Sequence, residues 1–209
     1  KKLQFRRKYL TLTLNEAADS SEPPLAVFAA RLDGCSLAPD YHRFDQLLPG
    51  ETKLVFRVHT MQPQSVYNGF TDSDRLSLDA TERFLDVTHR QYTARCTEFS
   101  SICGVFTDEP HRGMVFSDFS DPGEARRWSI PWTDDLPEAF EAAYGKPLLP
   151  RLPELFLLLR GKPVSKLKWQ YMELLQTLFL TRFLQPIRRW AQENDLKTTG
   201  HFLHEDSLS

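Results

Sequence analysis

A short apolar run, Ile102-Cys103-Gly104-Val105-Phe106-Thr107-Asp108-Glu109-Pro110, ends in two adjacent carboxylates and a proline. A run of this length, rich in β-branched and aromatic residues, is typical of a buried parallel strand. Pro110 has no N–H to offer a neighbouring strand, so we expect the strand to end there. Asp108 and Glu109 are therefore predicted at the carboxyl end of a strand, which is the edge where parallel α/β folds bind ligands and carry out chemistry.

The chain before this run is predicted to supply a strand and a helix. Residues 54–58 are apolar apart from Arg57 and favour a strand. Ser77 is suited to cap a helix that runs to about Arg95. Strand, helix and strand then form a βαβ unit with a right-handed crossover. Residues 1–50 contain the alternating stretch 9–14 and several turn signals, so they are predicted to be a β-rich, antiparallel segment.

The chain after the run is predicted to return to the same sheet. Residues 111–163 form a long excursion rich in Pro, Trp and Asp, of a length typical of functional loops or small helical caps. A long amphipathic helix begins after Ser165, and Pro186 is expected to kink it. Residues 196–202 are predicted to be a third parallel strand. Three such strands do not close a barrel, so we favour a chain that belongs to a longer protein over a small open sheet.

Composition restricts the classes of function. The chain has 209 residues, 41% of them hydrophobic, and a net charge of −2, which suits one sizeable core and argues against nucleic acid as a partner. No run approaches the roughly 18 apolar residues of a membrane span, so no membrane partner is predicted. The three cysteines are odd in number and unpatterned, and no apolar signal segment follows the basic amino end. A cytoplasmic location is expected; no cofactor is predicted, and the oligomeric state stays open.

Four stretches together resemble a known family: Tyr67-Asn68-Gly69, Phe106-Thr107-Asp108-Glu109-Pro110, Pro131-Trp132-Thr133-Asp134-Asp135-Leu136, and Thr199-Gly200-His201 with Glu205 behind it. They are similar to large bacterial glycoside hydrolases with a (β/α)8 catalytic barrel, related to the α-L-rhamnosidase group with interrupted barrels. The order and spacing of the four stretches carry the resemblance. It implies an α/β fold with a partial (β/α)8 barrel over residues 51–209, and residues 1–50 as a β-rich insertion or subdomain.

The resemblance also implies a carbohydrate substrate and roles for individual residues. Glu109 would be the general acid that protonates the leaving glycosidic oxygen, with a pKa raised by apolar neighbours such as Phe106 and by nearby Asp108. Glu205 would be the second carboxylate, about 5–5.5 Å away in a retaining enzyme or about 6.5–9.5 Å in an inverting one. In many barrel glycosidases this partner comes from a later strand, which this chain lacks. The substrate-binding candidates are Asn68, Asp108, His111, Trp132, Asp134 and His201.

Each prediction has an alternative. Glu109 can instead cap a helix or pair with Arg112, and Asn68 can simply form a turn. The whole chain can be a non-catalytic carbohydrate-binding module, or a metal-dependent hydrolase that uses His201, His204 and Glu205. The spacing His-x-x-His-Glu differs from the helical zinc signature His-Glu-x-x-His, so no metal ligand is predicted.

Overall fold

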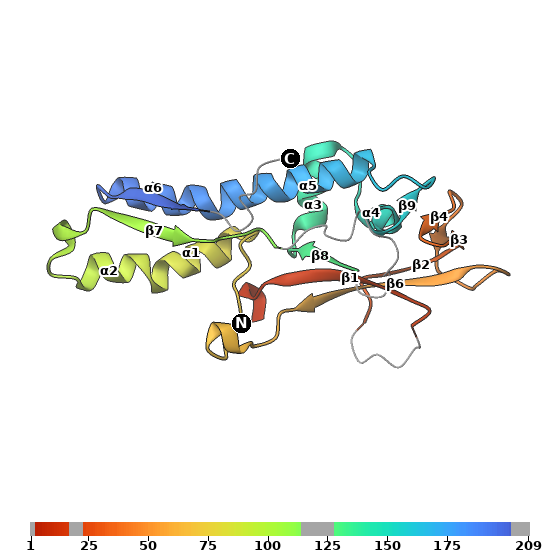
Figure 1. The fold of residues 1–209 in the computed structure, drawn as a ribbon, viewed down its shortest axis with the longest axis horizontal. Helices are drawn as coiled ribbons and strands as arrows, with labels where there is room; N and C mark the ends of the chain where they lie inside the picture. The colour runs from red at the N-terminus through yellow and green to blue at the C-terminus, as the bar shows by residue number, and fades with distance from the viewer. Residues whose placement is uncertain (1–2, 17–22, 114–127, 202–209) are drawn as a thin grey trace. The chain divides into compact units, whose positions relative to one another are not determined.

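The computed structural model describes residues 3–16, 23–113 and 128–201 (Figure 1). The chain forms two compact units, and neither is continuous in sequence. Unit 1 comprises Lys1–Arg7, Gln62–Arg112 and Leu175–Ser209, and unit 2 comprises Lys8–Met61 and Gly113–Leu174. The predicted domains, 1–50 and 51–209, stay a prediction. No helix in the described part of the chain is long and apolar enough to cross a membrane.

Unit 2 is built on a five-stranded antiparallel sheet with the strand order β5-β2-β6-β1-β8. The strands are β1 (Lys8–Leu14), β2 (Ala26–Ala30), β5 (His42–Arg43), β6 (Thr52–Thr60) and β8 (Trp128–Trp132). The alternation at residues 9–14 predicted a half-buried strand, and β1 confirms it, because Leu10 and Leu12 are buried while their neighbours are less so. Leu12 pairs with Phe56 of β6, which packs edge-on against Phe28 with ring centroids 5.7 Å apart.

Among its described residues, unit 2 also contains a second, smaller sheet and three short helical segments. A small sheet joins β3 (Leu32–Asp33), β4 (Ser36–Leu37) and β9 (Leu158–Leu159), and the helical segments are α3 (Leu136–Tyr144), η5 (Leu149–Arg151) and α4 (Leu152–Phe156). The helix α3 ends at Gly145, whose φ of 67° is the left-handed conformation that glycine adopts without strain. Phe156 of α4 contacts Phe56 of β6 with ring centroids 5.5 Å apart, so this helix packs on the sheet through at least one aromatic pair.

One long helical stretch follows Ser165, whose hydroxyl oxygen accepts a hydrogen bond from the backbone N–H of Lys168. It consists of α5 (Lys166–Phe179), the π-helical segment η6 (Leu180–Leu184) and α6 (Gln185–Glu193). The predicted kink at Pro186 takes the form of this π-helical segment directly before it. Proline cannot donate to the carbonyl one turn back, and the wider turn lets the N–H of Gln185 bond to Leu180 instead.

Besides the part of this helical stretch from Leu175 onward, unit 1 contains two short helices and a parallel strand pair. The helices α1 (Leu78–Val87) and α2 (His89–Arg95) follow η1 (Leu3–Phe5) and η2 (Ser65–Tyr67), and η3 (Phe99–Ser101) leads into β7 (Gly104–Asp108). Ser77 caps α1 as predicted, since its hydroxyl accepts from the N–H of Ala80. The single helix predicted to Arg95 is interrupted at Thr88, where φ is −122° and ψ is −84°. The strand β10 (Lys197–His201) lies parallel to β7.

The predicted fold class, an α/β fold with a partial (β/α)8 barrel, is wrong. In residues 3–16, 23–113 and 128–201 most pairing is antiparallel, and β7 with β10 forms a two-stranded parallel sheet rather than part of a barrel. Residues 54–58, read as a parallel strand, lie in β6 between two antiparallel partners. A strand covered on both faces is apolar throughout whichever way its neighbours run, so hydropathy did not reveal its direction. The strand β7 is also less buried than predicted, since Phe106 is 60% exposed.

Candidate functional site

The strands β7 and β10 end together at one edge of unit 1. Their register pairs Lys197 with Gly104 at one end and His201 with Asp108 at the other. Two glycines, Gly104 and Gly200, allow the backbones of the two strands to approach closely. A Cβ on Gly104 would lie 2.7 Å from the carbonyl oxygen of Lys197, and one on Gly200 would lie 2.1 Å from that of Thr107. Gly200 also has a φ of +145°, which side-chain-bearing residues rarely adopt. The edge therefore depends on two positions that only glycine fits.

Two carboxylates and a histidine meet at this edge. The Nε2 atom of His201 lies 3.4 Å from a carboxylate oxygen of Asp108. Glu109 is exposed and follows directly, with a φ of 41° that turns the chain away from the strand. The alternative pairing of Glu109 with Arg112 is not formed, and the Arg112 guanidinium donates to the side-chain oxygen of Gln176. Glu109 thus stands at the strand end with its carboxylate open to solvent.

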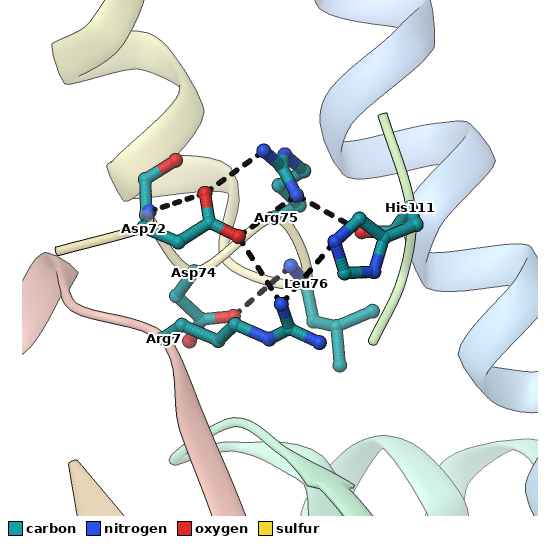
Figure 2. A network of polar contacts seen from close by, with 7 residues as sticks. Arg7, Asp72, Asp74, Arg75, Leu76 and His111 are labelled. Atoms are coloured by element: carbon teal, nitrogen blue, oxygen red, sulfur yellow. Dashed lines mark hydrogen bonds and ion pairs between the residues drawn. The ribbon is translucent and has the colours of Figure 1, made fainter. Parts of the chain in front are cut away.

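A partly buried polar network holds the loop that follows Glu109 (Figure 2). Asp72, 5% exposed, accepts hydrogen bonds from Arg7 at 3.2 Å and from Arg75 at 2.9 Å. Arg75 also donates to the backbone carbonyl of His111 at 3.2 Å, and Arg7 Nη1 lies 3.4 Å from His111 Nε2. Burial lowers the pKa of Arg75, and the Asp72 carboxylate opposes that shift. One carboxylate thereby fastens the segment two residues beyond Glu109 to the turn that leads into α1.

A pocket of about 410 Å³ lies beside the same edge. Its walls come from β10, from the end of β7 and from the helical segments η6 and α6. The polar lining consists of Thr107, Thr198, Thr199, His201, Gln185 and Arg188. Leu180, Leu184 and Ile187 form an apolar side. A concave site with apolar walls and a few convergent polar groups has the ordinary make-up of a small-molecule site.

The structure distributes the predicted site residues over both units. Asp108, Glu109, His111 and His201 lie together around the end of β7 and β10, and Asn68 lies in the same unit, in a left-handed turn after η2 with a φ of 51°. Trp132 and Asp134 belong to unit 2. Trp132 is only 3% exposed, and Asp134 accepts from the Lys8 ammonium at 2.8 Å. The substrate-binding roles of all these residues stay predictions.

Glu205, His204 and Asp206 lie outside the described residues. Within the described ranges, no group of three or more His, Cys, Asp or Glu side chains is arranged to hold a metal ion. The metal-dependent alternative was based on His201, His204 and Glu205, so only its first residue is placed. His201 pairs with Asp108, which gives it a structural partner at the strand end.

Sequence reasoning missed Arg7, Asp72 and Arg75. Arg7 lies in a basic amino-terminal run that was considered only as a possible signal segment, and its carboxylate partner is 65 residues away. The only local signal was the charged cluster Asp72-Ser73-Asp74-Arg75 directly before the Ser77 cap. Such a cluster is ordinary at a helix start, so pattern alone did not separate a buried network from a solvated turn.

No family model matches the chain, and no curated protein matches it. Among solved structures, the chain is similar to the rhamnosidase from Novosphingobium sp. PP1Y, with a TM-score of 0.51 and 19% sequence identity over 78% of this chain. The match spans 15% of the length of that rhamnosidase chain. At this identity the similarity concerns the fold alone. The chain therefore resembles, in fold, a portion of a glycoside hydrolase.

Proposed function

We propose that this chain contributes to the active site of a glycoside hydrolase, with Glu109 as the general acid. The observation that supports this best is the parallel pairing of β7 and β10, which end in register at Asp108 and His201. The sequence alone suggested that these two strand ends belong to one site. In the structure they lie side by side, and the two strands run in the same direction. The fold similarity to a rhamnosidase makes a glycoside the first substrate class to test.

The surroundings of Glu109 suit proton delivery. A general acid must reach the leaving oxygen of the substrate, and the exposed Glu109 side chain at a turn is free to do so. Its backbone is held on both sides, by the close strand pair before it and by the bond from Arg75 to the His111 carbonyl after it. Asp108 lies 3.4 Å from His201, whereas Glu109 has no side-chain partner among the described residues, so we assign the two neighbouring carboxylates different roles.

The second carboxylate is proposed to be Glu205, which follows β10 in the sequence, or an acid outside this chain. It would act as the nucleophile in a retaining enzyme or as the base that activates water in an inverting one. A cytoplasmic location, expected from the unpatterned cysteines, belongs to the same proposal.

The test compares leaving groups. In the protein that contains this chain, Glu109→Gln is assayed with aryl glycosides, beginning with rhamnosides, whose phenol leaving groups range from strongly to weakly acidic. Loss of the general acid should lower turnover of the weakly acidic leaving groups by about 10²–10⁴-fold. Strongly acidic phenols need little protonation, so their turnover should fall much less. Asp108→Asn is the matched control, because it removes the adjacent exposed carboxylate.

A steep dependence on the leaving group in Glu109→Gln, absent in Asp108→Asn, supports the assignment. Equal losses for all leaving groups, or unchanged turnover, would remove Glu109 from the chemistry. If turnover is unchanged and the chain still binds sugar, Glu109 is not catalytic and the second candidate, a non-catalytic carbohydrate-binding module, is favoured. The observation that supports this second candidate is the pocket of about 410 Å³ beside the strand ends, because a pocket can bind a sugar without catalysis.

A further inference from the structure

The pocket beside the β7 and β10 ends differs in charge from the edge next to it. Arg188 projects from α6 into the lining, and none of the described lining residues is an aspartate or glutamate. In the described part of the chain, Arg188 forms no ion pair, whereas His201 already faces Asp108. Asp108 and Glu109 are therefore not among the lining residues, and the Arg188 guanidinium lies on the wall with no acidic partner among the residues that the structure describes.

The polar lining suits a hydroxyl-rich ligand. The hydroxyls of Thr107, Thr198 and Thr199 form no side-chain hydrogen bond with any described residue. Neighbouring strand residues point to opposite faces, so a wall that includes residues 198–201 in succession also presents backbone groups. Donors and acceptors of this kind bind sugar hydroxyls, while Leu180 and Ile187 can contact the apolar face of a sugar ring.

The size narrows the ligand further. Small-molecule pockets run from about 300 to 1,000 Å³, so a volume of about 410 Å³ fits one or two sugar rings. A neutral sugar would leave the guanidinium of Arg188 without an anionic partner among the described residues. An anionic group on the sugar would form a charge-assisted hydrogen bond with it.

We propose that this pocket binds a monosaccharide-sized acidic sugar, whose carboxylate or phosphate pairs with Arg188. The proposal rests on the proposed function for the sugar class and adds the charge of the ligand. It also predicts that sugar recognition and proton delivery are separable, since Arg188 and Glu109 lie on different elements.

The test uses isothermal titration calorimetry on the full chain with three probes: glucuronate, glucose 6-phosphate and glucose. At least one acidic probe should bind about 10-fold or more tightly than glucose, the preference expected from one hydrogen bond to a charged group. Arg188→Gln should abolish that preference. Arg189→Gln is the matched control, because Arg189 is also exposed on α6 but does not line the pocket. Circular dichroism checks that both variants fold.

Tighter binding of glucuronate identifies a carboxylate ligand, and tighter binding of glucose 6-phosphate identifies a phosphate ligand. The proposal is overturned if glucose binds as well as both acidic probes, if no probe binds, or if Arg188→Gln and Arg189→Gln lose the preference equally. Glu109→Gln should bind the acidic probe like the unaltered chain. If the acidic probes show no preference, the leaving-group test can still support Glu109 as the general acid. If the leaving-group test rejects Glu109, the calorimetry can still show that Arg188 binds an acidic sugar.

Discussion

Replacing Lys168 with methionine should remove a pH-dependent destabilisation, measured as the free energy of unfolding, from unit 2. Lys168 is only 3% exposed, and its ammonium donates to the carbonyl of Pro163 at 2.9 Å. Burial lowers the pKa of Lys168 from 10.5 to about 8. Between these two values the unfolded chain binds the proton more tightly than the folded chain does. The stability contributed by this residue must therefore rise with pH across that window.

The magnitude follows from the two pKa values of Lys168, 10.5 unfolded and about 8 folded. At pH 7 the buried charge costs about 3 kcal/mol of unfolding free energy. At pH 9.5 most folded molecules carry a neutral amine, and the cost falls to about 1 kcal/mol. The unaltered chain should therefore gain about 2 kcal/mol relative to Lys168→Met between pH 7 and pH 9.5. Groups that titrate in both proteins cancel in this difference.

Urea unfolding at pH 7, 8, 9 and 9.5 measures the difference directly. Lys166→Met serves as the matched control, because Lys166 begins the same helix with an exposed side chain. Its difference from the unaltered chain should stay flat with pH. A flat difference for Lys168→Met, or one in which the unaltered chain loses stability as pH rises, would refute the assignment of Lys168 as a buried, desolvated ammonium.

Three other changes test the site and its support. Asp72→Asn should cost about 3–5 kcal/mol, because it leaves two arginines around a neutral group, whereas Asp40→Asn, in an exposed ion pair, should cost about 0–1 kcal/mol; urea unfolding compares them. Gly200→Ala should destabilise the chain more than Gly161→Ala, since only the first meets a backbone carbonyl, and faster amide exchange in β10 would show it. Burial lowers the pKa of His89, so stability should fall as pH drops below about 6.5, and His89→Phe should flatten that decline.

Features set by neighbouring residues were predictable from the sequence. The alternation at residues 9–14 predicted β1, and Ser77 predicted the start of α1. These signals are local, because a strand face and a helix cap each depend on a few adjacent positions. The end of β7 at Asp108, before Pro110, follows the same logic.

Features set by distant partners were not predictable in this way. Residues 54–58 were correctly expected to form a strand, but the direction of β6 depends on β1 and β2, which flank it. The helix break at Thr88 was not predictable, because neither proline nor glycine lies at this position to indicate the end of a helix. The network around Asp72 joins segments 65 residues apart, and each segment looks like an ordinary charged turn when read alone.

The difference between local and distant contacts also explains how Glu109 can be positioned although the predicted barrel is not formed. A barrel would have held Glu109 through many parallel neighbours, but β7 has one, β10, in the described part of the chain. Contacts other than parallel strand pairing must therefore determine the position of Glu109. The close approach at Gly200 fixes the chain before it, and the bond from Arg75 to the His111 carbonyl fixes the chain after it. Since Asp72 orients that arginine, a carboxylate that touches no substrate becomes as important to the geometry of the edge as the strand itself.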